Sequence, residues 1–253
     1  MDNIESALSA VRGGAHRIEL CSALALGGLT PSVGVFKTIK KLITTKCDIF
    51  IMIRPKYNTD FVYDDNDINA MEEEIKIFAE MGANGFVFGC LTQDGTIDVE
   101  KCKKLLEVAN GFPCTFHRAF DIVKNPEESL KIIINLGFSR VLTSGQKNSA
   151  ISGVTLIKKL VEIVKELKSD VIIIAGGGIN SNNLKDVLLE TGINEFHGSA
   201  AFKYFKEKNI FLTDESEVKK MIFISIFLFL LFSFNVFSYR YQRRRRRRCL
   251  RRG

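Results

Sequence analysis

Short runs of β-branched and aromatic residues alternate along this chain with longer segments of helical periodicity. Such alternation is typical of a parallel sheet covered by helices, because each parallel strand needs a long crossover before the next one. Seven strands are predicted, at 17–21, 48–54, 85–90, 114–119, 140–144, 171–176 and 195–199. Helices are predicted at 3–13, 35–44, 65–81, 98–109, 126–136, 151–168 and 181–191.

The predicted units recur about every 28 residues, which favours a (β/α)8 TIM barrel over residues 1–220. A doubly wound open sheet is the alternative that seven strands permit. The first predicted helix has no strand before it. Because a seven-stranded parallel barrel leaves two unpaired edges, we expect that the first strand of a barrel of eight is absent from this chain.

Positive charge is concentrated at the C-terminus. The net charge is +7, but nine arginines lie in the last fourteen residues, and residues 1–221 hold 27 basic and 29 acidic side chains. This near-neutral body does not predict a nucleic-acid partner. Six cysteines without a CxxC pair favour a reducing compartment over a secreted disulfide framework. Since the N-terminus shows no signal-peptide pattern, we expect a cytoplasmic protein.

Residues 221–253 are predicted to be separate from the barrel. The run 221–237 (MIFISIFLFLLFSFNVF) is almost wholly apolar, and an arginine-rich stretch follows it. Its length is at the lower limit for a membrane span, so one interpretation is a tail anchor in an organelle membrane. The other interpretation is a gene-model artefact, and the protein then has no membrane partner.

Residues at the C-terminal ends of barrel strands form the mouth where barrel enzymes place their active sites. Side chains alternate along a strand, so Ile18 and Leu20 should face the helices and leave Glu19 and Cys21 inside. The same alternation brings to the mouth Arg54, His117, Thr143 and His197. Because buried charges need partners, we expect Glu19 and Arg54 to pair with each other or with a ligand.

Two glycine motifs follow the last two predicted strands. Barrels often bind phosphate there with backbone N–H groups, and glycine permits a close approach. The predicted anion site consists of Gly176, Gly177, Gly178 and Ser199. A tight turn would need the same glycines.

The thiol and the two imidazoles predicted at the mouth are soft ligands that suit a metal ion. Thiolate and imidazole suit Cu(I), and His117 or His197 could approach Cys21 across the mouth. A buried cysteine is more often a small apolar core residue. The candidate metal ligands are therefore Cys21, His117 and His197.

Six motifs occur along the chain in a fixed order: RIELC at 17–21, GGLTPS at 27–32, IRP at 53–55, TFHRAFD at 115–121, RVLTSG at 140–145 and GGGI at 176–179. In their order and spacing they resemble the CutC family of copper-homeostasis proteins, and the resemblance covers about 218 residues. It implies a TIM barrel, a cytoplasmic role in copper tolerance or trafficking, Cu(I) binding and often a homo-oligomer.

The chain departs from the family pattern in three places. The family's first strand, which carries a cysteine proposed to ligate copper with the one matching Cys21, lies before Asp2 and has no counterpart here. The family's RGGDF loop appears as KYNTDF at 56–61, and the segment after Ala200 is shortened.

Three functions are therefore considered. The first is Cu(I) binding in copper homeostasis, with Cys21 as a ligand. The second is an enzyme acting on a small phosphorylated or carboxylated metabolite, with His117 or Glu19 as acid or base and Arg54 as anion clamp. The third is a truncated, non-functional copy.

Overall fold

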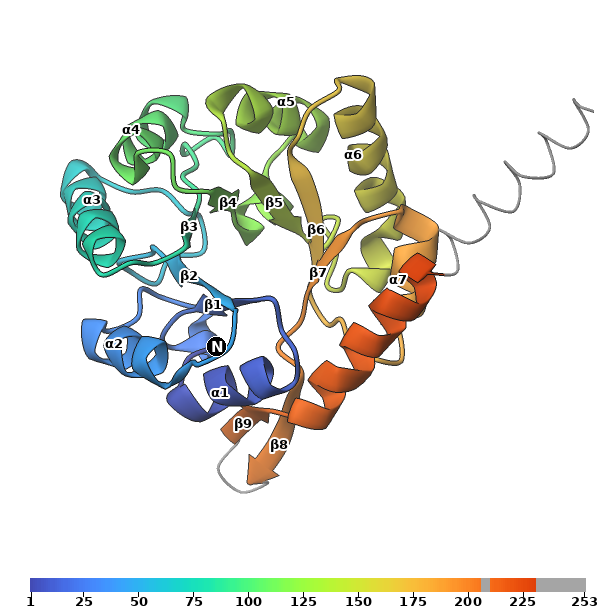
Figure 1. Ribbon diagram of the computed structural model, residues 1–253. Helices are drawn as coiled ribbons and strands as arrows, with labels where there is room; N and C mark the ends of the chain where they lie inside the picture. The colour runs from blue at the N-terminus through green and yellow to red at the C-terminus, as the bar shows by residue number, and fades with distance from the viewer. Residues whose placement is uncertain (206–209, 231–253) are drawn as a thin grey trace, which may run out of the picture.

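The computed structural model describes residues 1–205 and 210–230. Seven parallel strands form one curled sheet in the order β1 to β7, and helices surround its outer side (Figure 1). The strands are β1 (Arg17–Leu20), β2 (Asp48–Met52), β3 (Gly85–Phe88), β4 (Cys114–Phe116), β5 (Arg140–Thr143), β6 (Ile172–Gly176) and β7 (Glu195–His197). The α-helices are α1 (Ile4–Arg12), α2 (Val33–Leu42), α3 (Asp65–Glu80), α4 (Val99–Ala109), α5 (Pro126–Leu136), α6 (Val154–Glu166) and α7 (Leu184–Thr191). The 3-10 helices are η1 (Leu24–Leu26), η2 (Arg118–Ile122) and η3 (Ile151–Gly153).

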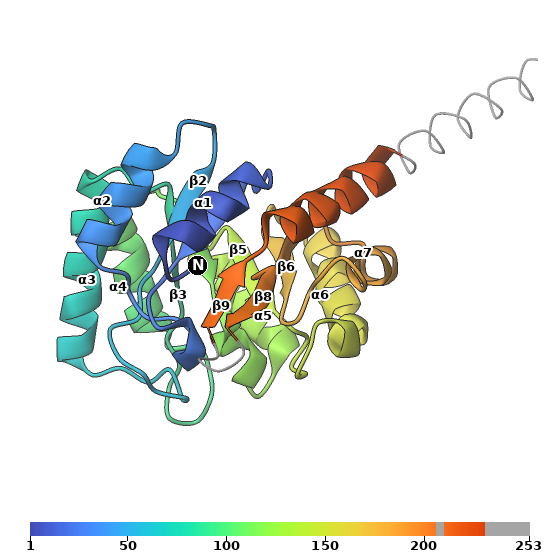
Figure 2. The ribbon, with the colours of Figure 1, turned by 90° about the horizontal axis from the view of Figure 1, so that it is seen from below.

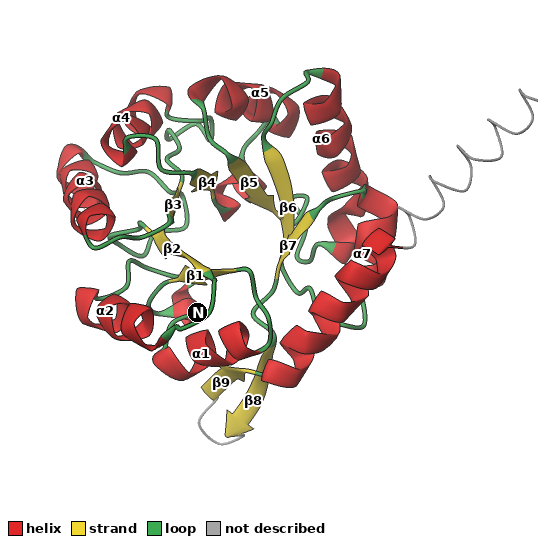
Figure 3. Ribbon diagram, viewed as in Figure 1, coloured by secondary structure: helices red, strands yellow, loops and turns green. Residues whose placement is uncertain are grey.

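The strand order decides between the two predicted folds. Each strand pairs in parallel with the next one along the chain, and the helices form a ring around the strands (Figure 3). A doubly wound sheet would reverse its strand order and carry helices on both faces. The curled parallel sheet is instead that of a (β/α)8 fold, as the repeat length predicted.

The alternation of side chains in β1 and β2 follows the prediction. Ile18, Leu20 and Ile51 are buried in the main core with the helices. Phe50 and Met52 form a second, inward-facing cluster with Cys21 and Val87.

Several strands end earlier than predicted. β4 stops at Phe116, because His117 is the N-cap of η2 and its side chain accepts from the N–H of Ala119. β2 likewise stops at Met52, and Arg54 lies beyond the strand. The apolar pattern continues into these turns, since their side chains are buried as well, and periodicity alone therefore overextends the strands.

β1 and β7 lie at the two ends of the sheet and do not pair with each other within the described residues; we call this place the seam. The amine of Met1 donates to the carbonyl of Glu19 at 2.7 Å, and the N–H of Cys21 donates to the carbonyl of Met1 at 2.9 Å. Met1 therefore pairs with the outer edge of β1 as a neighbouring parallel strand would.

A short antiparallel hairpin follows the sheet and leads to a C-terminal helix at 215–230. The hairpin consists of β8 (Ala201–Phe205) and β9 (Ile210–Thr213), and sequence reasoning did not predict it. The C-terminal helix lies next to α1 over the seam (Figures 1 and 2). Glu215 accepts from Arg12 of α1 at 2.8 Å, and Gly13 leaves room for the side chain of Val218.

This helix continues through the predicted domain boundary at 220–221. Met221 packs into the main core and Leu228 is buried, whereas Phe223, Phe227 and Phe229 are exposed. None of the helices in residues 1–205 and 210–230 combines the length and the apolarity that a membrane crossing requires. Residues 231–237 of the apolar run, and the arginines after them, lie outside the described residues.

Candidate functional site

A cavity of about 410 Å³ lies inside the curled sheet at the seam. Glu19 of β1 and His197 of β7 line it, together with Ser199. Its apolar wall is formed by side chains from the central strands and the C-terminal helix, including Phe50, Val87, Leu142, Ile174, Val218 and Met221. The cavity therefore combines a few polar groups from the two edge strands with a largely apolar lining, as small-ligand sites do.

Three charged residues at the N-terminal ends of the strands hold the two sides of the seam together. Glu195 of β7 accepts from Arg17 of β1 at 2.8 Å and from Arg140 of β5 at 3.1 Å. Both guanidinium groups also lie over the ring of Phe50. Burial opposes ionisation of Glu195, but the Arg17 hydrogen bond and the two positive charges hold the pKa of its carboxyl below the usual range. The seam is thus bridged by side chains.

His197 is neutral near pH 7. Burial lowers the pKa of its imidazole, and the nearby Glu19 carboxylate only partly offsets this effect. A neutral imidazole beside a carboxylate can accept or donate a proton, and either group could also contact a ligand in the cavity.

The Cys21 thiol is buried next to Met1. Its sulfur lies 3.6 Å from the Met1 carbonyl, to which the thiol donates, and 3.9 Å from the Met1 amine. A Cβ at Gly28 would lie 3.4 Å from the same sulfur, so the glycine leaves space beside the thiol. Burial raises the pKa of Cys21, against the opposing effect of the terminal ammonium, so the thiol is protonated at neutral pH.

Arg54 does not pair with Glu19, contrary to the first of the two expectations. Its Nη1 donates to the carbonyls of Leu26 and Gly28 at 3.2 Å, and its Nη2 donates to the carbonyl of Asn58 at 2.5 Å. The loops after β1 and β2 wrap around the guanidinium and supply backbone acceptors. Arg54 consequently organises the mouth, whereas Glu19 faces the cavity.

His117 is buried behind Phe61. Its Nδ1 accepts from the N–H of Ala119 at 3.3 Å, so the ring proton is on Nε2. Burial, reinforced by the charge of Arg54, lowers the pKa of His117 to about 3. Phe61 packs edge-on against the imidazole, with 4.8 Å between the ring centroids, and Arg54 lies 4.8 Å from the same phenyl ring.

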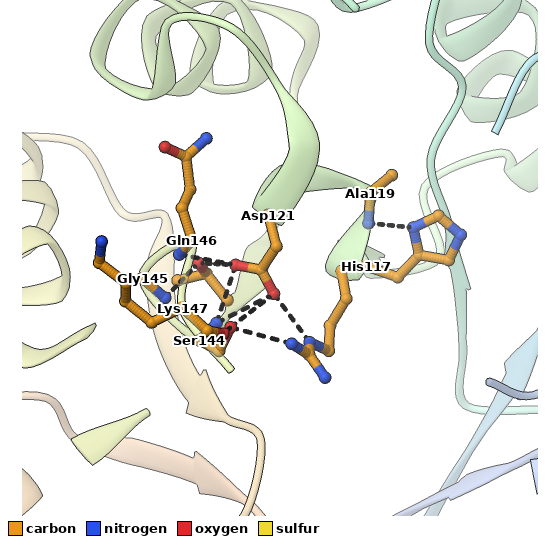
Figure 4. Close-up of polar contacts among 9 residues, drawn as sticks. His117, Ala119, Asp121, Ser144, Gly145, Gln146 and Lys147 are labelled. Carbon is orange, nitrogen blue, oxygen red and sulfur yellow. Dashed lines mark hydrogen bonds and ion pairs between the residues drawn. The ribbon is translucent and has the colours of Figure 1, made fainter. Parts of the chain in front are cut away.

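Asp121 organises the mouth after β4 and β5 (Figure 4). One carboxylate oxygen accepts from Thr143 at 2.5 Å and from the N–H of Ser144 at 2.9 Å, and the other accepts from Arg118 at 2.7 Å. Arg118 also donates to the Ser144 hydroxyl at 2.9 Å. The TFHRAFD motif contains both Asp121 and Arg118, but strand alternation predicts only His117 from it, because alternation cannot describe side chains that project from a 3-10 turn.

The residues of the predicted anion site lie at the end of β6 and in the segments that follow β6 and β7. Gly177 and Gly178 adopt positive φ values of 105° and 71°, and a side chain at Gly177 would approach Ser144 and Arg118. Ser199, by contrast, is exposed on the rim of the seam cavity. These glycines are required by the turn, and the anion site stays a prediction.

The candidate metal ligands are distributed around the mouth. His197 lines the seam cavity, His117 is buried against Phe61, and Cys21 lies with Met52 in the inward-facing cluster. Within residues 1–205 and 210–230, no group of three or more His, Cys, Asp or Glu side chains is arranged to hold a metal ion. The Cys21 thiol and the Met52 thioether lie together in the inward-facing cluster. The thiols of Cys90 and Cys102 are also neighbours, but they are buried in the main core among the helices.

The parallel sheet, its ring of helices and the polar residues after the strands define a protein of the (β/α)8-barrel class. Residues 1–202 match the model of the CutC family. The human copper homeostasis protein cutC homolog is 46% identical over 200 residues, which are 79% of this chain and 71% of the human protein. The homolog in Drosophila melanogaster is 44% identical over 202 residues, 79% of this chain and 75% of that protein. This chain belongs to the CutC family.

Solved structures agree with this assignment. The crystal structure of the putative copper homeostasis protein CutC from Streptococcus agalactiae matches with a TM-score of 0.68 and 36% identity, over 72% of this chain and 88% of that one. Phosphoribosylanthranilate isomerase from Thermotoga maritima matches with a TM-score of 0.55 and 16% identity, over 89% of this chain and 94% of that one. The second likeness shows the fold alone.

Proposed function

We propose that this chain acts in copper homeostasis in the cytoplasm and binds Cu(I) as its cargo, with Cys21 as a ligand. Family membership supports the role, because the relatives that share 44–46% identity are named copper homeostasis proteins. The observation that carries the ligand assignment is the common cluster of the Cys21 thiol and the Met52 thioether.

The donor types suit Cu(I). Leu20 of β1 pairs with Ile51 of β2, so the residues that follow them, Cys21 and Met52, are neighbours on the inward face. Thiolate and thioether are soft ligands that favour Cu(I), and an apolar surrounding suits a weakly hydrated cation. Cys21 is free of any disulfide. Binding would replace the thiol proton, since the thiolate is the form that ligates metal.

A Cu(I) titration tests this proposal. The full-length protein, kept reduced and free of oxygen, competes with a coloured Cu(I) chelator. Cys21→Ser should weaken binding at least about tenfold, and Met52→Leu should weaken it less, because a thioether is the weaker donor. Cys47→Ser is the matched control, since Cys47 precedes β2 at the opposite end of that strand. Equal Cu(I) affinity of the wild type and Cys21→Ser would refute the assignment.

The seam cavity favours a second candidate, an enzyme acting on a small anionic metabolite. Its volume of about 410 Å³ is in the range of small-ligand sites, and Glu19 and the neutral imidazole of His197 line it. A screen of phosphorylated and carboxylated metabolites with wild type and Glu19→Gln tests this function. Turnover that Glu19→Gln abolishes would support it, and a lack of turnover across the screen would count against it.

A further inference from the structure

Three buried polar groups at the mouth lack hydrogen-bond partners within the described residues: Nε of Arg54, the hydroxyl of Tyr63 and Nε2 of His117. These residues are only 4%, 2% and 3% exposed. All three groups can donate a hydrogen bond, because Nε2 carries the proton of His117. A buried donor without an acceptor is destabilising, so three together call for an explanation.

The three residues are neighbours. Arg54 follows β2 and His117 follows β4, and both contact the ring of Phe61. Gly89, after the intervening β3, has no side chain, and a Cβ there would lie 2.9 Å from the His117 imidazole. The absence of that side chain lets His117 lie over the end of β3. The charge of Arg54 acts on both His117 and Tyr63.

The charge at this place is also unbalanced. Arg54 is buried, yet none of the ion pairs within residues 1–205 and 210–230 involves it. Its guanidinium donates to backbone carbonyls and lies beside the neutral Tyr63 hydroxyl, so no negative group balances its charge. A buried cation without a counter-ion is costly, and neutral carbonyls compensate its charge only in part. A positive charge with three unused donors favours an acceptor that is negative.

Phe61 covers these groups in a strained conformation. Its φ is +54°, a left-handed value that an aromatic residue rarely adopts. Its ring lies against both the guanidinium and the imidazole. The surrounding loop is held by Asn58, whose side chain donates to Val62 and Asp60. The strain is thus maintained where the ring shields the donors from water.

We propose that Arg54, Tyr63 and His117 form a buried binding site for a small oxyanion, of the carboxylate or phosphate type, and that the Phe61 side chain closes it. The anion oxygen would accept from the three donors and neutralise Arg54. This site is separate from Cys21 and does not depend on copper binding.

Tyr63→Phe is the sharpest variant, because it removes only one hydroxyl. If that hydroxyl lacks a structural partner, the melting temperature of Tyr63→Phe without anion should equal or exceed that of the wild type. In sodium acetate or sodium phosphate, at constant ionic strength, the wild type should show a saturable rise in melting temperature. Tyr63→Phe should weaken this binding about tenfold, the equivalent of one lost hydrogen bond to a charged group. Tyr57→Phe, at an exposed tyrosine, is the matched control.

Phe61→Ala tests the covering role and should weaken anion binding, because loss of the ring opens the donors to water. The response to acetate compared with phosphate distinguishes the two oxyanion types. Absence of a saturable shift in the wild type would overturn the proposal, since water alone would then satisfy the donors. A lower melting temperature of Tyr63→Phe without anion would also overturn it, because the hydroxyl would then have a structural partner. Cys21→Ser should leave anion binding unchanged, so failure of this site and failure of copper binding are distinguishable.

Discussion

Acid should destabilise this protein through His117, and the size of the effect follows from its environment. The pKa of His117 is about 3 in the folded state, mainly because of burial, against 6.5 for an ordinary histidine. The depressed value means that the unfolded chain takes up a proton below pH 6.5 and the folded chain does not. The contribution of neutral His117 to the free energy of unfolding is therefore fully present above pH 6.5, and it is lost as the pH decreases toward 3. The loss approaches about 1.4 kcal/mol per pH unit only well below pH 6.5, where the unfolded histidine is fully protonated. Summed from pH 7.5 to 5.0, it amounts to about 2 kcal/mol.

Urea unfolding followed by circular dichroism measures this effect. His117→Asn retains an acceptor at the position of Nδ1 for the N–H of Ala119 and has no group that titrates. The variant loses ring packing equally at every pH, so its stability deficit should shrink by about 2 kcal/mol from pH 7.5 to 5.0. Amine buffers avoid carboxylates that could bind near Arg54. His16→Asn, at an exposed histidine, is the control and should parallel the wild type. A deficit that stays constant with pH would refute the reasoning.

Three further predictions concern the mouth and the seam. Arg54→Met should lower the free energy of unfolding by about 2 kcal/mol in urea titrations, because the carbonyls of Leu26, Gly28 and Asn58 lose their donors, and this cost exceeds what is recovered by removing the unpaired charge. A change below about 0.5 kcal/mol would contradict the role of Arg54. Glu195→Gln should lower the free energy of unfolding at pH 7, because it breaks the ion pair with Arg17. The difference in free energy from the wild type should vanish as acid protonates Glu195 through its lowered pKa. A difference that persists at low pH would exclude this cause. Cu(I) affinity should rise with pH, by up to about tenfold per unit below the raised pKa of Cys21, in chelator competition at pH 6 to 8; a flat profile would exclude Cys21 as the ligand.

The sequence was sufficient to predict the fold class, because each βα unit carries its own pattern. The inward direction of Cys21 and the helix-facing direction of Ile18 and Leu20 also followed from strand alternation. The hairpin of β8 and β9 could not be predicted in this way, because it is not part of a repeated βα unit.

The mouth was harder to predict, because its residues project from turns. Alternation suggested that Arg54 would meet Glu19, but loop carbonyls take up the guanidinium instead. Backbone acceptors have no sequence signature, so this arrangement could not be inferred. The role of Asp121 could have been suspected from its spacing from His117 and Arg118, since a carboxylate shortly after a strand often caps the next loop.

The open seam affects how a disturbance spreads through the molecule. In a closed ring of strands, each strand is hydrogen-bonded to a neighbour on both sides. A strand that separates from one neighbour is then still held by the other. Within residues 1–205 and 210–230 the ladder is a row with two ends, and Glu195, Arg17 and the C-terminal helix connect those ends through side chains. The central strand β4 pairs with a strand on each side, whereas β7 pairs with β6 and β1 pairs with β2 and with the backbone of Met1. In the described part of the chain, acid that protonates Glu195 therefore removes a contact between the two ends of the sheet, and the seam cavity lies at that place.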